Sequence, residues 1–112
     1  MAYSKKDQFD LAGRRVADFA KALAHPARLA ILKRLAEENS CVCGQIADAI
    51  PLAQSTVSQH LKALKEAGLI QGEINGPKSC YCINDDAFKQ LAQLMSDFLQ
   101  SIEPKTTLKN CC

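Results

Sequence analysis

The sequence predicts one mainly α-helical domain with a β-hairpin, over residues 1–103, followed by a short tail at 104–112. Two observations predict this class. Apolar residues recur at three- and four-residue steps in several segments, which is the period of a helix face. An Asn-Gly turn signal in "NGPK" lies between two strand-like runs, "LIQGEI" and "SCYCIN", and this pattern is typical of a hairpin.

Three helices are expected in the first half of the chain. The first covers residues 9–24, where an apolar stripe consists of Phe9, Ala12, Val16, Phe19, Ala20 and Leu23. The second begins at Pro26, because proline suits the first turn of a helix. A short third helix is expected from about residue 44 to residue 50, and Pro51 ends it.

The segment "QSTVSQHLKALKEAGL" predicts a fourth helix. Val57, Leu61 and Leu64 repeat at four and three residues, so they form its buried face. Gln54 or Ser55 can cap its start, and Gly68 supplies a left-handed stop at its end.

A last helix is expected after the hairpin, from about Asp85 to Ile102, and Pro104 stops it. Its stripe is wide and consists of Phe88, Leu91, Leu94, Met95, Phe98, Leu99 and Ile102. Stripes this wide in a small domain favour a homodimer that forms through the first and last helices.

Four helices, a hairpin and a terminal helix (α-α-α-α-β-β-α) make a winged helix-turn-helix in outline. In that fold the second helix of the motif enters the major groove of double-stranded DNA and presents its N-terminal residues to the bases. The candidate DNA-binding residues are Gln54, Ser55, Thr56, Ser58, Gln59, His60 and Lys62, with Lys78 at the hairpin tip.

Within this set, Gln59 is the best candidate for a base contact, since its amide can bond adenine bidentately, and Lys62 suits the phosphate backbone. A solvated polar helix face is the alternative. His60 lacks a second histidine or carboxylate at ligand spacing, so a structural or phosphate-binding role is favoured over a metal ligand.

Composition places the chain among cytoplasmic proteins. The N-terminus "MAYSKKDQFD" is polar and unlike a signal peptide, and no apolar run reaches the ~18 residues of a membrane span. The net charge of +2 argues only weakly for a nucleic-acid partner. No nucleophile–base or carboxylate pairing and no CxxC motif on a βαβ unit is present, so an enzyme is not expected.

The six cysteines form three close pairs, Cys41/Cys43, Cys80/Cys82 and Cys111/Cys112. A reducing cytosol argues against a disulfide framework, and close thiol pairs indicate soft-ion binding or redox chemistry. Small buried side chains are the alternative for the first two pairs, and a disordered tail is the alternative for the third.

The segments "LAHPARLAILKRL", "IADAIPLAQSTVSQHLKALKEAGLI" and "YCIN" closely resemble the ArsR/SmtB family of metal-responsive repressors, over roughly residues 10 to 100. The resemblance implies a homodimeric winged helix that sits on an operator and leaves when an inducer binds. It also implies that Tyr81 and Ile83 face the core, so by strand alternation Cys80 and Cys82 point to the other face.

Cys41-Val42-Cys43 lies where arsenic- and cadmium-sensing members of that family carry a CxC motif. In an extended segment both sulfurs can face one side, and the adjoining helix N-terminus favours the thiolate. Where arsenic sensors supply a third thiol, three residues on, this chain has Ile46. The remaining candidate metal ligands are Cys111 and Cys112, which could also form a separate site with Cys80 or Cys82.

The leading hypothesis is therefore a repressor of a metalloid-resistance operon, released from DNA by arsenic(III) or antimony(III) and needing no organic cofactor. A thiol-redox or persulfide-responsive repressor is the alternative, and there the strain of a CxC disulfide favours links between separate pairs. A cadmium- or lead-type sensor also stays open. The last helix lacks histidine, which argues against a zinc sensor.

Overall fold

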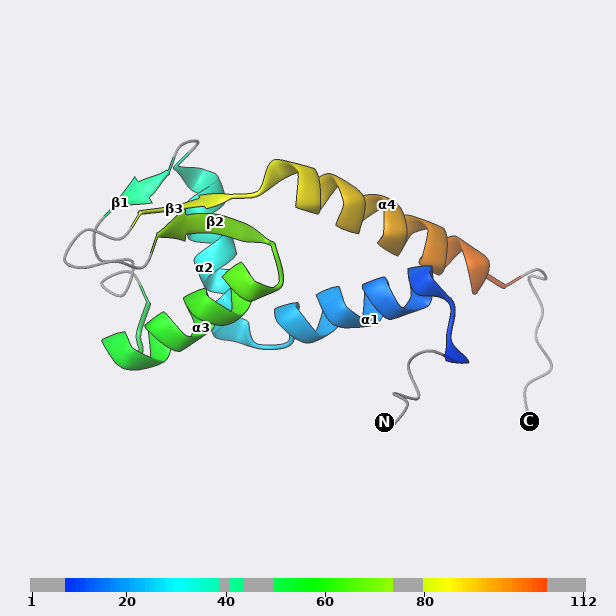
Figure 1. Ribbon diagram of the computed structural model, residues 1–112, viewed down its shortest axis with the longest axis horizontal. Helices are drawn as coiled ribbons and strands as arrows, with labels where there is room; N and C mark the ends of the chain where they lie inside the picture. The colour runs from blue at the N-terminus through cyan, green and yellow to red at the C-terminus, as the bar shows by residue number, and fades with distance from the viewer. Residues whose placement is uncertain (1–7, 39–40, 44–49, 74–79, 105–112) are drawn as a thin grey trace.

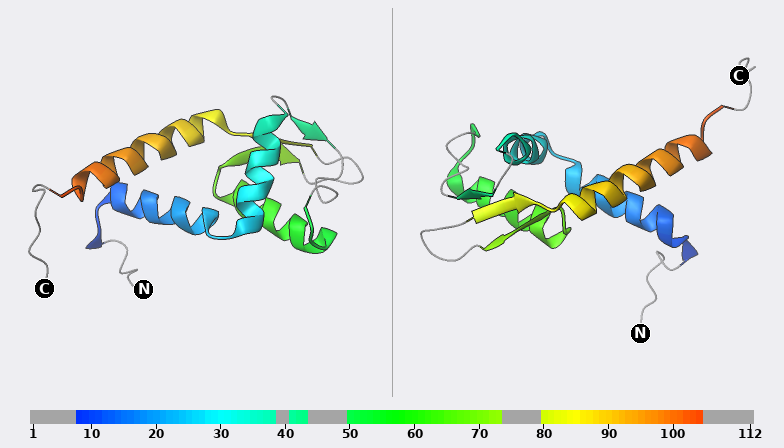
Figure 2. Two further views of the ribbon diagram at one scale, coloured as in Figure 1. Left: turned by 180° about the vertical axis from the view of Figure 1, so that it is seen from behind. Right: turned by 90° about the horizontal axis from the view of Figure 1, so that it is seen from above.

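The computed structural model describes residues 8–38, 41–43, 50–73 and 80–104. Along the chain these form α1 (Leu11–Leu23), α2 (Pro26–Glu37), β1 (Val42–Cys43), α3 (Gln54–Glu66), β2 (Ile70–Glu73), β3 (Cys80–Ile83) and α4 (Asp85–Ser101). The sheet lies against α2 and α3, while α1 and α4 run side by side away from it as an arm (Figure 1; Figure 2). This arrangement is a winged helix-turn-helix, as predicted.

The predicted elements correspond to the observed ones with one addition and one gap. The helix expected at residues 9–24 is α1, and the helix expected from Pro26 is α2. The helix expected in "QSTVSQHLKALKEAGL" is α3, and the last helix, expected from Asp85, is α4. The two strands of the expected hairpin are β2 and β3. The addition is β1, which was expected only as an extended segment. Residues 44–49 of the expected short helix, the hairpin tip and the cysteine tail lie outside the described residues.

β3 is the central strand of a three-stranded antiparallel sheet with the order β1-β3-β2. Val42 pairs with Tyr81 and Cys43 with Cys80 on one side, and β2 pairs along the other side, from Ile70 opposite Ile83 to Glu73 opposite Cys80. At Gly72 an added Cβ would overlap the backbone carbonyl of Cys80, and the φ angle of 155° also favours glycine there. A side chain at this position would therefore push β2 away from β3.

The core lies between the sheet and the helices. Its most deeply buried members come from α2, α3, the sheet and the turn between α3 and β2: Ile31, Leu35, Val57, Leu64, Leu69, Ile70 and Tyr81. Phe19 from α1 and Leu91 from α4 join the same cluster and fasten the arm to it. Burial of Val57, Leu61 and Leu64 confirms the predicted apolar face of α3 and leaves the opposite face in solvent.

The helix ends confirm two of the sequence-based expectations and correct a third. Pro26 does open α2, after the cap residue His25, and Gly68 does take a left-handed φ of 81° after α3. The predicted cap of α3 by Gln54 or Ser55 is wrong, because Gln54 is already the first helical residue. The cap position falls on Ala53, whose side chain cannot accept a hydrogen bond.

Apolar side chains remain exposed at the far end of the arm. Phe9 and Leu11 lie at the start of α1, and Phe98, Leu99 and Ile102 lie at the end of α4; these side chains are 43–65% exposed. The two groups share one end of the molecule because α1 and α4 are neighbours (Figure 2). No described helix has both the length and the apolar character needed to cross a bilayer.

Replacing Ile31 with Ala should lower the free energy of unfolding by about 2–5 kcal/mol, because Ile31 is completely buried and its truncation leaves a cavity. The matched control is Leu29→Ala on the same helix, where the side chain is 51% exposed and the loss should stay below about 1 kcal/mol. Urea unfolding at one protein concentration measures both, and equal losses would contradict the core assignment.

Candidate functional site

α3 carries most of the predicted DNA-binding residues, and they lie outside its buried stripe. Five of them are exposed and two are partly exposed. The exposed ones are Gln54, Ser55, Ser58, Gln59 and Lys62, and the partly exposed ones are Thr56 and His60. The structure thus brings seven of the eight candidates together, and the eighth, Lys78, lies outside the described residues.

The first turn of α3 is open to an anion. Its cap residue provides no side-chain acceptor for the backbone N–H groups of that turn. Unpaired N–H groups at a helix N-terminus, together with the helix dipole, attract a phosphate. The short polar side chains Ser55 and Thr56 stand at the same turn, so a nucleic-acid backbone fits here chemically.

His60 ties α3 to the junction of α1 and α2. The Arg28 Nε donates to His60 Nδ1 at 3.1 Å, and the same guanidinium donates through Nη1 to the Ala22 carbonyl at 3.1 Å. The ring of His25 lies 4.3 Å from that of His60, measured between centroids, and His25 Nδ1 accepts from the Ala27 N–H at 3.0 Å. These contacts join α3 to α1 and α2; the sequence favoured a structural or phosphate-binding role for His60, and that choice stays a prediction.

The environment of His60 lowers the pKa of its imidazole. Burial of the ring is the main cause, and the positive charges on His25 and Arg28 act in the same direction. Because Arg28 donates to Nδ1, the neutral ring carries its proton on Nε2. Arg28 was not singled out from the sequence, since nothing in its local pattern indicates a contact with a residue on α3.

Two of the cysteine pairs meet at the β1–β3 edge of the sheet. Cys41 and Cys82 form a disulfide with a Cα–Cα distance of 4.3 Å. Cys80 is disulfide-bonded as well, and its partner in the strand register is Cys43. This differs from the expectation of free thiols, because the pairing of β1 with β3 sets the two CxC segments opposite each other.

Strand alternation orients the wing cysteines as the sequence implied. Tyr81 is 2% exposed and belongs to the core, while Cys80 and Cys82 on either side of it are partly exposed. Cys41 is exposed. The Cys41–Cys82 group is therefore within reach of a small solute.

The predicted metal ligands are described only in part. Cys41 lies in the β1–β3 group, only the backbone of Cys43 is described, and Cys111 and Cys112 lie outside the described residues. Among the described side chains, no three His, Cys, Asp or Glu residues form a ready metal site, and the sulfurs of Cys41 and Cys82 are bonded to each other. The sequence left the role of Cys80 and Cys82 open, between a thiol pair for soft ions or redox chemistry, partners of the tail cysteines, and small buried side chains.

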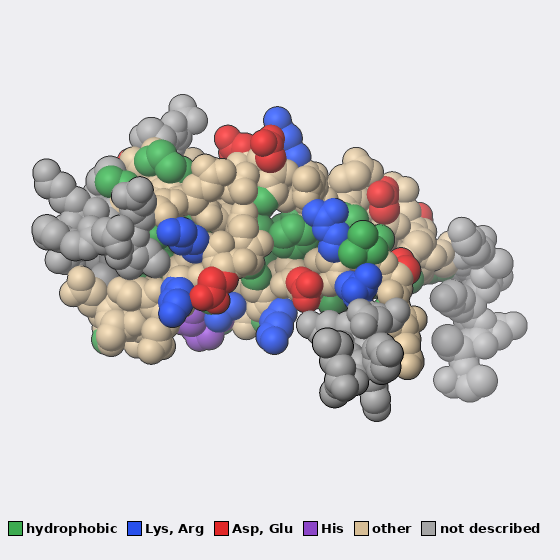
Figure 3. Space-filling model, in the orientation of Figure 1, with side chains coloured by type: hydrophobic (Ala, Val, Ile, Leu, Met, Phe, Trp, Pro, Cys, Tyr) green, Lys and Arg blue, Asp and Glu red, His purple; other side chains and the backbone are tan. Residues whose placement is uncertain are grey.

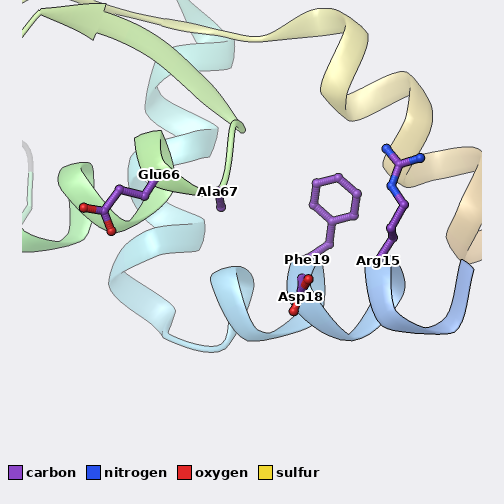
Figure 4. Close-up of a pocket in the computed structure, with 5 residues that line it drawn as sticks. All are labelled: Arg15, Asp18, Phe19, Glu66 and Ala67. Atoms are coloured by element: carbon purple, nitrogen blue, oxygen red, sulfur yellow. The ribbon is translucent and has the colours of Figure 1, made fainter. Parts of the chain in front are cut away.

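A surface hollow lies between α1 and the end of α3. Arg15, Asp18, Phe19, Glu66 and Ala67 line it (Figure 4). None of these is a cysteine or one of the predicted DNA-binding residues. The face of the molecule shown in Figure 3 carries basic and acidic side chains side by side, with hydrophobic side chains visible between them.

Comparison with protein families and curated proteins finds regulators of transcription. Residues 25–71 match the family described as "Bacterial regulatory protein, arsR family". An uncharacterized HTH-type transcriptional regulator of Methanocaldococcus jannaschii is 40% identical over 84 residues, which are 74% of this chain and 93% of that protein. The arsenical resistance operon repressor of Bacillus subtilis is 37% identical over 93 residues, 82% of this chain and 85% of the repressor.

Two further comparisons cover a repressor and a solved structure. The SmtB repressor of Mycobacterium tuberculosis is 43% identical over 68 residues, which are 61% of this chain and only 50% of that protein. A homodimeric winged helix-turn-helix DNA-binding domain from Mycobacterium bovis, described as a possible ArsR-family regulator, superposes with a TM-score of 0.60 at 28% identity, covering 97% of this chain and all of that domain.

Stability should fall as the pH drops below about 6.5, the usual histidine pKa, because of His60. The pKa of His60 is lowered in the folded state. Below pH 6.5 the unfolded chain therefore binds more protons than the folded chain, and this proton binding stabilises the unfolded state. Above pH 6.5 this difference vanishes. His60→Gln should therefore show a smaller loss of urea midpoint between pH 7.5 and pH 5.5 than the parent protein. The neighbouring exposed variant Gln59→Ala should keep the parent's loss, and an unchanged loss in His60→Gln would contradict the assignment.

Proposed function

The chain belongs to the arsR family of bacterial regulatory proteins, and we propose that it represses a metalloid-resistance operon in the cytoplasm. Its relatives are DNA-binding transcriptional regulators, and the chain is not an enzyme. Arsenite or antimonite, bound to the thiolates of Cys41 and Cys43, releases it from the operator. The observation that supports this proposal is β1, which contains Cys43, directly follows Cys41, lies between α2 and α3 in the chain and pairs with the wing strand β3.

The DNA-reading element in this proposal is α3. Its polar face is exposed while its apolar face is held in the core, so the helix can enter the major groove without losing its packing. Gln59 reads a base, Lys62 meets a phosphate, and Ser55 and Thr56 meet the backbone at the open first turn. Lys78 of the hairpin tip contacts the neighbouring DNA backbone.

A homodimer presents two such helices to the operator. The apolar end of the arm supports this assembly, because Phe98, Leu99 and Ile102 on α4 stay exposed beside the start of α1. Burial of these side chains against a second copy stabilises the dimer by the hydrophobic effect. Two-fold symmetry then sets the reading helices on half-sites one turn of DNA apart.

Release requires that the inducer bind the free protein more tightly than the DNA-bound protein. Couplings of about 1–3 kcal/mol are typical of allosteric pairs of sites, and they are reciprocal. β1 is suited to this role because it lies between α2 and α3 in the chain and pairs with the wing. A soft ion that draws Cys41 and Cys43 together changes the position of the wing relative to α3.

A second candidate inducer is an oxidant, and the Cys41–Cys82 disulfide favours it. Loss of two electrons and two protons from the two thiols, taken up by a peroxide or a disulfide oxidant, forms this bond. The link joins separate pairs, as the redox alternative from the sequence expected. Titration of operator-bound, reduced protein with arsenite, cadmium and an oxidant separates the inducers by fluorescence anisotropy.

Replacing Gln59 with Ala should weaken binding to the chain's own promoter DNA by about 1–3 kcal/mol and reduce its preference over scrambled DNA. Lys62→Ala should instead weaken binding to both DNAs alike and lower the slope of log affinity against log salt by about 1. The control is Lys89→Ala, an exposed lysine on α4, which should leave both affinities unchanged. If Gln59→Ala binds like the parent, Gln59 does not read a base.

Replacing Cys41 with Ser should abolish release by arsenite while leaving operator affinity nearly intact, because a hydroxyl is a poor ligand for a soft ion. Anisotropy of reduced protein on labelled promoter DNA, titrated with arsenite, measures both quantities. Ser96→Ala on α4 serves as a control for an exposed side chain far from β1. Release of the Cys41→Ser variant at the parent's arsenite concentration would contradict the site assignment.

A further inference from the structure

The wing strand places a sulfur directly beside the CxC segment. β1 and β3 run antiparallel, with Val42 opposite Tyr81. The antiparallel register therefore sets Cys41, the residue before Val42, opposite Cys82, the residue after Tyr81. Their Cα atoms lie 4.3 Å apart and their sulfurs are bonded. Reduced, the same backbone leaves two thiols within bonding distance of one small ion.

The surroundings of these sulfurs suit an ion that enters from solvent. Tyr81 and Val42 lie toward the core, and by alternation Cys82 points to the opposite face of the sheet. Cys41 is exposed and Cys82 partly exposed. The site is thus held rigidly by paired strands on one side and is accessible on the other.

We propose that Cys82 is the third sulfur of the arsenic(III) site, completing the pair Cys41 and Cys43 across the β1–β3 pairing. This inference rests on the proposed function and names the ligand that the sequence left open at Ile46. Arsenous acid, As(OH)₃, reacts with three thiols to give As(SR)₃ and three waters, so each thiol loses its proton and arsenic loses its three hydroxyls.

The disulfide and the arsenic complex exclude each other, because both use the sulfurs of Cys41 and Cys82. A dithiol supplies two electrons and two protons, and a phosphine supplies two electrons while water supplies the two protons and the oxygen of the phosphine oxide; either reductant converts the disulfide to the thiols of Cys41 and Cys82, two of the three that arsenic needs. The Cys41–Cys82 disulfide is therefore the oxidised form of the sensor site, and an oxidised protein does not bind arsenite.

Contacts at the end of β3 carry the effect toward α3. The backbone N–H of Asn84 donates to the Leu69 carbonyl at 3.0 Å, and its side-chain amide donates to the Gly68 carbonyl at 2.9 Å. Gly68 and Leu69 join α3 to β2. A shift of β3 caused by arsenic at Cys82 thus reaches the end of the DNA-reading helix through these bonds.

The test compares two arsenicals on the full, phosphine-reduced chain. Arsenite binds three thiols, whereas phenylarsine oxide binds two with loss of one water. Cys82→Ser should lower arsenite affinity about 100-fold or more, the usual gain from one further tethered contact, and leave phenylarsine oxide affinity unchanged. The matched control is the double variant Cys111→Ser/Cys112→Ser, which should bind both arsenicals like the parent.

Direct titration followed by native mass spectrometry measures these affinities and the number of thiol protons lost. Cys82→Ala and the operator affinity of each variant check that the effect does not arise from misfolding. Parent protein oxidised to the Cys41–Cys82 disulfide provides a test without substitution: it should lose arsenite binding and regain it on reduction.

The outcomes separate this inference from the proposed function. If the tail double variant loses arsenite and Cys82→Ser does not, the wing ligand is wrong while the metalloid repressor stands. If the parent binds arsenite through Cys82 and stays on the operator, the wing site is right and the proposed inducer is wrong. If oxidised parent binds arsenite like reduced parent, the Cys41–Cys82 site is wrong.

Discussion

β3 has a hydrogen-bonded strand on each side, and it lies between the parts of the molecule that bear on function. Its inward side chain Tyr81 packs in the core with residues of α2 and α3. Its outward side chains are two cysteines, one of which is bonded to Cys41, the residue just before β1. Where β3 ends, Asn84 holds the chain that leaves α3. Displacing this strand would disturb the core, the cysteine group and the end of the DNA-reading helix together.

α3 can present a polar face to solvent because contacts on its buried side hold the helix in place. Val57, Leu61 and Leu64 pack into the core, and the Arg28–His60 hydrogen bond links the helix to the α1–α2 junction. Little of the exposed face is then needed for stability, so its residues are available for DNA. The arm divides in a similar way: Phe19 and Leu91 pack it against the core, whereas its far end keeps apolar side chains in solvent, where the proposed homodimer would bury them.

Cysteine chemistry connects the two inducers considered for this repressor. A soft trivalent ion and a disulfide both require thiols that approach closely, and paired strands provide this at little cost in chain entropy, since the backbone is already ordered. The open face of the β1–β3 edge admits small solutes. In the proposed mechanism, redox state and metalloid binding act on one group of sulfurs, and the state of oxidation decides whether an ion can bind.

Local patterns were enough to predict much of this protein, and contacts between distant segments decided the rest. Three- and four-residue apolar spacing determined the helices and the buried face of α3, Pro26 determined the start of α2, and Gly68 determined the end of α3, because each depends only on neighbours in the chain. The resemblance to the ArsR/SmtB family implied Tyr81 in the core, and strand alternation then oriented Cys80 and Cys82 to the other face.

Two features depended on the tertiary structure. The pairing of Cys41 with Cys82 joins residues 41 positions apart, and β1 has only two residues, too few for a periodic signal. The Arg28–His60 contact spans 32 positions, and no spacing along the chain links the two residues. Such contacts are determined by how the helices and strands pack around a shared core, which composition and spacing along the chain do not encode.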